Sequence, residues 1–378
     1  MLPPTPILLL DLAAEHAPYQ AELDAAWRET VQEAAFIQGP AVGQFAQELS
    51  AYLGGAHVVP CANGTDALTL ALLSLALPPG TEVIVPAFTY VATLEAAVLL
   101  GLRPVLADVL PDTFNLDPAA VRAALTPRTG AVIAVHLFGQ CADLEALTSI
   151  CQAAGVALIE DNAQAMGATF TFADGCPAYA GTVGEVGTTS FFPSKNLGCL
   201  GDGGALFTRD AARAQLLQQL ANHGQRRKYQ HQYVGLNSRL DTLQAALLRV
   251  KLRHLPTAQA ARQANAARYD ATLGTVAGVQ IPARDPRSTH VFHQYTLKIA
   301  DGQRDALQKR LAGVGTSSAV YYPVPVHEQE AYTFLCYKRG DFPVAEQLCS
   351  EVLSVPVQPA LTGEQIELVA AIISEVAN

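Results

Sequence analysis

The sequence predicts an α/β fold in which a large, mostly parallel sheet flanked by helices precedes a smaller C-terminal α+β domain. Short β-rich runs alternate with longer helical runs through the first two-thirds of the chain, and this alternation is typical of parallel strands joined by crossover helices. The chain has 378 residues, 50% of them hydrophobic, which is more than one small core requires. After Leu240 the alternation gives way to one long helical segment. We therefore predict a large domain at 1–255 and a small domain at 256–378.

The strands expected in the large domain are short β-rich runs, and their alternation with helical runs indicates parallel strands covered on both faces. They lie at 58–61, 82–86, 103–108, 131–135, 157–160, 188–192 and 205–208. The helices expected between them lie at 66–77, 90–100, 118–125 and 143–154. This order places the carboxyl ends of several parallel strands along one edge of the sheet.

The second part of the chain begins with a helical segment at 241–273 that is rich in Ala, Leu, Gln and Arg. It contains Pro256, which lacks a backbone N–H and should kink or divide the helix. A strand at 294–299 and helices at 304–312 and 364–376 are expected after it. This mixture of elements predicts the smaller α+β domain.

Charge and cysteine usage exclude several classes of protein. The net charge of −10 argues against a nucleic-acid or acidic-membrane partner, because both attract an excess of Lys and Arg. The seven cysteines are scattered without a Cys-x-x-Cys pair, so neither a disulfide framework nor a zinc site is indicated. No apolar run is long enough to cross a membrane, and the apolar start at 1–12 lacks the features of a signal peptide. We expect a soluble, cytoplasmic protein.

The stretch SFFPSKNLG at 190–198 places one lysine, Lys195, among small, aromatic and proline residues. Such an apolar site, lined by hydroxyl groups, favours the neutral amine because desolvation disfavours the ammonium ion. A neutral amine can attack an aldehyde and form a Schiff base, as lysine does in enzymes that use pyridoxal phosphate. A solvated loop lysine is the alternative, so the rest of the chain has to decide.

Polar residues follow the first expected strand at 62–66. Gly64 permits close approach of the backbone, and Thr65 or Asp66 could cap the helix that begins there. The free N–H groups of that helix would then face outward and suit a phosphate. An ordinary helix cap without a ligand is the alternative.

Two further strand ends carry groups that a flat, nitrogen-containing cofactor could use. Asp161 could hydrogen-bond to a protonated ring nitrogen, and Gln164 could reach a neighbouring oxygen; an aspartate that holds a turn together is the alternative. The run PAFTY at 86–90 places aromatic rings where one could stack on the cofactor, although core packing explains any single ring equally well. Taken together, these are the parts that a pyridoxal-phosphate site needs.

The chain resembles the sugar aminotransferases of the DegT/StrS family, which are pyridoxal-phosphate enzymes of the fold type I aminotransferase class. The resemblance runs almost end to end and rests on five motifs in order: NGTDAL at 63–68, PAFTYVAT at 86–93, EDNAQA at 160–165, SFFPSK at 190–195 and GLNSRLD at 235–241. It implies a large sheet domain with a smaller C-terminal domain. It also implies a homodimer as the active unit.

The resemblance implies a role for each residue at the cofactor. Lys195 matches the lysine that forms the Schiff base and moves the proton, and Asp161 matches the residue that keeps the ring nitrogen protonated. Gln164 is similar to the partner of the phenolic oxygen, and Tyr90 occupies the stacking position. The matches to phosphate ligands are Gly64, Thr65, Ser190 and, from the neighbouring subunit, Asn237.

A second group of residues concerns the other substrate. RRKYQH at 226–231 is a basic run in an acidic protein, and Arg and His can grip a pyrophosphate while Tyr stacks on or bonds to a sugar; a solvated basic turn is the alternative. By resemblance this region lies near the entrance for the nucleotide sugar, and YYPVPVH at 321–327 faces the hexose. The candidate substrate-binding residues are Arg227, Tyr229, His231, Arg239, Tyr321 and His327.

The version of the lysine loop resembles members that aminate a sugar at carbon 3. HLFGQCAD at 136–143 is most similar to enzymes that make a UDP-linked 2-acetamido-3-amino-glucuronate for surface polysaccharide, with L-glutamate as amino donor. Enzymes acting on dTDP-3-keto-6-deoxyhexoses or on 4-keto sugars are alternatives. A pyridoxal-phosphate-dependent sugar dehydratase would carry histidine in place of Lys195, and a non-catalytic relative would have lost cofactor residues. Asn162 stands where many relatives have Ala or Cys, and it could add a hydrogen bond beside Asp161.

Overall fold

The computed structural model describes residues 6–300 and 302–377. Residues 1–5, the first part of the apolar start at 1–12, lie outside the described residues. No helix in the described ranges is both long and apolar enough to cross a membrane. The seven cysteines are free thiols, five of them buried.

The large sheet has seven strands in the order β1-β9-β8-β5-β4-β2-β3. Only β9 runs antiparallel to its neighbours, β1 and β8; the other pairs are parallel. The prediction of a mostly parallel sheet flanked by helices is therefore confirmed. The strands are β1 (His57–Cys61), β2 (Glu82–Pro86), β3 (Arg103–Ala107), β4 (Thr129–Val135), β5 (Ala157–Asp161), β8 (Val186–Ser190) and β9 (Gly204–Thr208).

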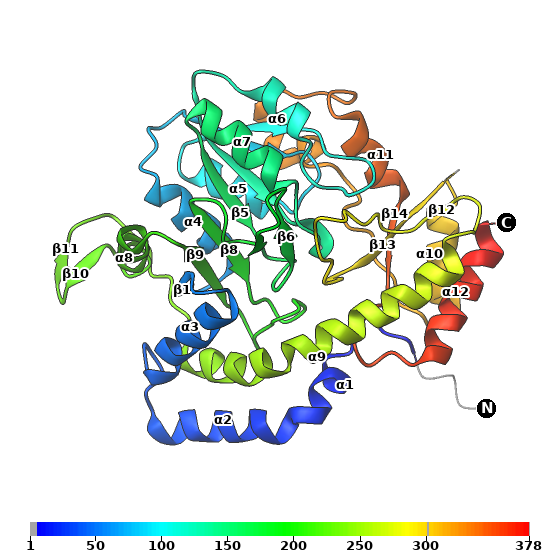
Figure 1. Cartoon of the computed structure of the whole chain (residues 1–378), viewed down its shortest axis with the longest axis horizontal. Helices are drawn as coiled ribbons and strands as arrows, with labels where there is room; N and C mark the ends of the chain where they lie inside the picture. Colours follow the sequence, from blue (N-terminus) through cyan, green and yellow to red (C-terminus); the bar gives the residue numbers. More distant parts are fainter. Residues whose placement is uncertain (1–5, 301, 378) are drawn as a thin grey trace.

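Helices cover both faces of this sheet (Figure 1). Apolar residues of α4, α5 and α8 pack with Val83 and Ile133 on one face, whereas those of α6 and α7 pack with Ile84 and Val132 on the other. This follows from the alternation of side chains along a strand, which sends neighbouring residues to opposite faces. The helices are α4 (Gly64–Ser74), α5 (Ala92–Leu99), α6 (Pro118–Ala124), α7 (Leu144–Ala154) and α8 (Ala211–Leu220).

The helix α9 (Thr242–Leu273) spans 32 residues and links the two parts of the molecule (Figure 1). Pro256 lies inside α9 and does not divide it, so of the two expected outcomes, a kink or a division, the division is wrong. Contacts with α2 and α3 hold its first half and contacts with α12 hold its second half, which offsets the hydrogen bond that proline removes. Three N-terminal helices were not predicted: α1 (Leu12–His16), α2 (Gln20–Glu33) and α3 (Pro40–Tyr52).

The C-terminal part forms a separate apolar cluster around a three-stranded sheet in the order β12-β13-β14. Tyr269 and Leu273 of α9 and Ile7 near the start of the described chain join this cluster, so a boundary near residue 255 stays a prediction. The elements of the C-terminal part are β12 (Val279–Gln280), β13 (Tyr295–Ile299), β14 (Val352–Val355), α10 (Arg304–Gly313), α11 (Pro343–Glu351) and α12 (Gly363–Ala377). Of these, α11 packs its apolar residues against the core of the large domain. Two small hairpins complete the fold, β6 (Thr169–Thr171) with β7 (Pro177–Tyr179), and β10 (Gln225–Arg227) with β11 (Gln230–His231).

Candidate active site

A cavity of about 700 Å³ lies at the carboxyl ends of β1, β2, β5 and β8. Loops that follow these strands form most of its wall, and the segment 320–323 from the C-terminal part closes it. Side chains distant in sequence meet here because the carboxyl ends of these strands share one edge of the sheet. The predicted site residues in its lining are Gly64, Thr65, Tyr90, Asp161, Gln164, Ser190, Lys195 and Tyr321.

Lys195 follows β8, and its backbone N–H donates to the carbonyl oxygen of Phe192 at 2.8 Å. Burial lowers the pKa of Lys195 from its ordinary 10.5 to about 8, and the negative charge of Asp161 opposes part of that shift. Because desolvation penalises the ammonium ion more than Asp161 stabilises it, the amine is far more nucleophilic near neutral pH than an exposed lysine.

Asp161 is the last residue of β5 and is buried at the cavity wall. Its Oδ1 accepts from the backbone N–H of Ala163 at 3.0 Å, which fixes the carboxylate relative to the strand end. Burial raises the pKa of Asp161, while the Ala163 hydrogen bond and the charge of Lys195 oppose the rise. A cation placed against this carboxylate, such as a protonated ring nitrogen, would favour its ionised form.

The helix α4 begins at Gly64, and its N-terminus faces the cavity. Asn63 is the N-cap, with its side chain accepting from the Asp66 N–H at 2.8 Å, so the expectation that Thr65 or Asp66 caps the helix is wrong. A Cβ atom at Gly64 would lie 2.7 Å from the Cβ of Ser190. Only glycine therefore lets the helix end and the Ser190 loop approach one another, and their N–H and hydroxyl groups suit a phosphate.

Gln164 is held in one orientation by two hydrogen bonds. Its Oε1 accepts from the backbone N–H of Phe138 at 2.7 Å, so its Nε2 faces the other way and donates to the Tyr322 hydroxyl at 3.2 Å. Tyr90 lines the cavity with 59% of its surface exposed, whereas Phe88 of the same motif is a core residue at 1%. Of these two rings, only Tyr90 is free to contact a ligand.

Tyr322 and His293 are among the cavity residues that the sequence interpretation did not name. Tyr322 is next to the predicted Tyr321 in the YYPVPVH motif. The motif therefore predicted that this segment lies at the site, but it did not single out Tyr322. His293 precedes β13 and carries no local signal, since a single histidine before a strand is an ordinary core residue. Asn162, which follows Asp161, donates from its Nδ2 to the carbonyl oxygen of Ala180 at 3.0 Å.

The other predicted residues lie outside this cavity. Arg227, Tyr229 and His231 belong to the exposed β10–β11 hairpin region, where the Nζ of Lys228 lies 5.4 Å from the centre of the Tyr229 ring. His327 is buried, with its Nε2 3.1 Å from the Glu346 Oε1. Neither group contacts the lysine cavity within this chain.

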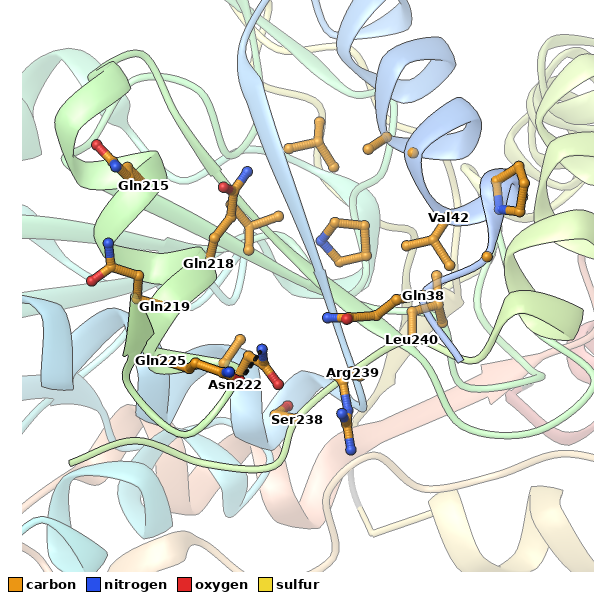
Figure 2. Close-up of a pocket in the computed structure, with 18 of the residues that line it drawn as sticks. Gln38, Val42, Gln215, Gln218, Gln219, Asn222, Gln225, Ser238, Arg239 and Leu240 are labelled. Carbon is orange, nitrogen blue, oxygen red and sulfur yellow. Dashed lines mark hydrogen bonds between the residues drawn. The ribbon is translucent and has the colours of Figure 1, made fainter. Parts of the chain in front are cut away.

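Arg239 lines a second cavity, of about 680 Å³, shown in Figure 2. Glutamines of α8 form one wall, and Gln38 and Val42 lie on the opposite side (Figure 2). Asn222 and Gln225 lie on its floor, with the Asn222 Nδ2 donating to the Gln225 Oε1 at 3.4 Å. Asn237 pairs with Asn222 by an antiparallel bridge, so Asn237 and Arg239 belong to a strip that runs beside this second cavity.

Comparison with known proteins identifies the larger group to which this site belongs. The DegT/DnrJ/EryC1/StrS aminotransferase family matches residues 19–374. The chain belongs to this family. It is a pyridoxal-phosphate-dependent aminotransferase, and the lysine, the buried carboxylate and the helix N-terminus of the first cavity fit that cofactor.

Relatives of this family match along the whole chain. The UDP-2-acetamido-2-deoxy-3-oxo-D-glucuronate aminotransferase of Pseudomonas aeruginosa is 41% identical over 97% of this chain and 99% of its own length. The UDP-N-acetyl-3-dehydro-α-D-glucosamine 3-aminotransferase of Acidithiobacillus ferrooxidans is also 41% identical, over 98% of this chain and 97% of its own. The crystal structure of DesV from S. venezuelae, in complex with a ketimine intermediate, superposes with a TM-score of 0.94 at 40% identity, covering 100% of this chain and 99% of that one.

Proposed function

We propose that this DegT/DnrJ/EryC1/StrS family member transfers an amino group from L-glutamate to the 3-keto group of a nucleotide-linked hexose. UDP-2-acetamido-3-keto-glucuronate, destined for surface polysaccharide such as an O-antigen, is the substrate that we favour. The observation that carries the chemistry is one cavity holding an amine with a pKa near 8 and a buried carboxylate. The similarity to the Pseudomonas aeruginosa enzyme over 97% of the chain supports the choice of sugar.

In this proposal the cofactor supplies an electron sink, and the residues of the chain hold it and move a proton. Lys195 would hold the aldehyde carbon of the cofactor, and its Nζ, when free, would carry the proton. Asp161 would hold a proton on the ring nitrogen, and the Gln164 Nε2 would donate to the phenolic oxygen. Tyr90 would stack on the ring, and Gly64, Thr65 and Ser190 would hold the phosphate.

We further propose a cytoplasmic homodimer with active sites shared between subunits. Asn237 and Arg239 lie outside the lysine cavity of their own chain, which supports a contact of these residues with the cofactor or substrate of a second copy. Exposed apolar residues support an interface near this strip: Phe36 and Ile37 precede α3, and Val234 is 91% exposed. The hairpin residues Arg227, Tyr229 and His231 would then reach the substrate entrance. Tyr321, which lines the cavity, and His327, which does not, are proposed to face or support the hexose pocket.

A second sugar class is favoured by a specific observation. DesV shares 40% identity and a TM-score of 0.94 with this chain, and the dTDP-3-amino-3,4,6-trideoxy-α-D-glucose transaminase of Streptomyces venezuelae is 40% identical over 94% of it. A dTDP-linked 3-keto-6-deoxyhexose is therefore the second candidate. Both candidates place the new amino group on carbon 3.

The test is turnover of L-glutamate with a panel of UDP-, dTDP- and GDP-linked 3-keto and 4-keto sugars, with the amino-sugar product identified by mass spectrometry. We expect 2-oxoglutarate and a 3-amino sugar in equal amounts, with the UDP-linked 3-keto-uronate used best. Exclusive use of 4-keto sugars would contradict the position of amination. Release of ammonia without an amino-sugar product would contradict transamination itself.

A further inference from the structure

His293 lines the active-site cavity together with Lys195 and has no role in the proposed reaction. It lies two residues before β13 and is only 7% exposed. A buried polar ring in a reactive cavity needs partners for both of its nitrogens. The two nitrogens of His293 differ in their hydrogen-bond partners.

The Nδ1 of His293 is protonated because of its neighbour Asn196. The Asn196 Nδ2 donates to the carbonyl oxygen of Val291 at 3.0 Å, and a carbonyl can only accept, so the orientation of this amide is fixed. Its Oδ1 then faces the His293 Nδ1 at a distance of 3.2 Å. An amide oxygen also only accepts, which requires the hydrogen to be on Nδ1.

The Nε2 of His293 is therefore the acceptor of a neutral ring. Burial, followed by the positive charges of Lys195 and Arg262, lowers the pKa of His293 well below 6.5. Arg262 is itself paired with Glu15 at 3.3 Å. Within residues 6–300 and 302–377, Nε2 has no hydrogen-bond partner and is not fully buried, and its side chain lines the cavity. We infer from this that Nε2 offers the cavity a neutral hydrogen-bond acceptor.

Lys195 is the donor that shares this cavity and whose charge acts on His293. Its amine alternates between a covalently bound and a free state in the proposed function, on which this inference rests. The free amine has to stay aimed at the reacting carbon although it is no longer tethered there. Asp161 provides a charged partner, and a neutral acceptor beside it would fix the direction of the amine without adding charge.

We propose that His293 is a positioning residue for Lys195, and that its Nε2 accepts a hydrogen bond from the Lys195 amine whenever that amine is free. Asn196, the residue after Lys195, selects the tautomer that makes this possible. The lysine loop thereby carries both Lys195 and Asn196, and Asn196 keeps the His293 Nε2 free of hydrogen so that it can accept from the Lys195 amine.

Two substitutions test the two nitrogens of the His293 ring separately. Asparagine in His293→Asn places its amide near the position of Nδ1, so it keeps a donor for Asn196 and removes the acceptor from the cavity. Glutamine in His293→Gln reaches the position of Nε2 with its Oε1, so it keeps the acceptor and loses the donor. The pKa of Lys195 is measured in the full-length protein freed of cofactor, from the pH dependence of amine labelling of the Lys195 peptide followed by mass spectrometry.

We expect His293→Asn to lower the pKa of Lys195 by about one unit, since the ammonium ion loses a hydrogen bond, and His293→Gln to stay near the wild type. The reverse order, a shift in His293→Gln alone, would show that His293 only anchors Asn196 and would overturn the proposal. If either variant fails to fold, ¹⁵N NMR of the wild-type protein decides, because an Nε2–H tautomer of His293 would also overturn it. Neither readout requires turnover. Failure of the proposed function would instead appear as an unmodified Lys195 in the holoenzyme after borohydride reduction.

Discussion

The Gln164 side chain donates to the Tyr322 hydroxyl at 3.2 Å and so joins the loop after β5 to the C-terminal segment that closes the cavity. The backbone N–H of Phe138 holds the Gln164 Oε1 and leaves its Nε2 facing the cavity. This arrangement makes Gln164 a donor, which is the role that an anionic phenolic oxygen requires. It also makes the position of Tyr322 depend on the cofactor-binding loop.

Replacing Gln164 with glutamate tests whether the donor matters. Gln164→Glu keeps an acceptor for the Phe138 N–H but loses the Nε2 donor and adds a negative charge near the phenolic oxygen. We expect affinity for pyridoxal phosphate to fall by about tenfold or more, the equivalent of roughly one hydrogen bond to a charged group. Tyr322→Phe, which removes only the hydroxyl, serves as the matched variant and should bind within about threefold of the wild type. Equal affinity of Gln164→Glu and wild type in an absorbance titration would refute the donor role.

The close approach of Gly64 to Ser190 predicts a steric effect on phosphate binding. In Gly64→Ala the new Cβ would lie 2.7 Å from the Ser190 Cβ, so the helix end and the lysine loop must move apart. We expect cofactor affinity to fall at least about tenfold, because the phosphate would lose aligned donors. Gly313→Ala, at the end of α10 where nothing lies within 4 Å of a new Cβ, should bind normally. A Gly64→Ala protein that binds as tightly as this control would show that the approach is unimportant.

The charge of Asp161 predicts a change in the pH dependence of cofactor capture. Asp161 raises the pKa of Lys195 against the larger effect of burial, which leaves it at about 8. Asp161→Asn removes that charge, so the pKa of Lys195 should fall and the neutral amine should persist to lower pH. The rate at which cofactor-free protein captures pyridoxal phosphate should therefore level off at lower pH than in the wild type. A shift toward higher pH would contradict this electrostatic relationship.

Sharing of active sites between subunits predicts that two inactive variants restore one another. Lys195→Ala and Arg239→Ala should each be nearly inactive as homodimers. After unfolding and refolding together, half of the dimers would be mixed, and one of their two sites would carry neither substitution. About a quarter of wild-type activity should return if Arg239 acts across the interface. No recovery, although mixed dimers are detected by mass spectrometry, would mean that Arg239 serves its own chain.

Much of the large domain could be predicted because its strands are short apolar runs between turn signals. The strand expected at 82–86 has the same bounds as β2, and the site residues after β1, β5 and β8 meet because the carboxyl ends of parallel strands share one edge of the sheet.

Local sequence patterns gave wrong predictions where contacts between distant parts of the chain determine the structure. Asn63, not Thr65, caps α4, and α9 continues through Pro256 because packing holds both halves. Tyr322 and His293 reach the cavity from the C-terminal part, which no spacing in the first part encodes.

Covalent trapping at Lys195 is the most direct test of the proposed chemistry. The purified holoenzyme, which should absorb in the near-violet, is reduced with borohydride, digested and analysed by mass spectrometry. We predict loss of the visible band and a phosphopyridoxyl group on the peptide that contains Lys195, with no adduct in Lys195→Ala. An adduct on another lysine, or normal transamination by Lys195→Ala, would contradict the assignment of this residue as the lysine that binds the cofactor.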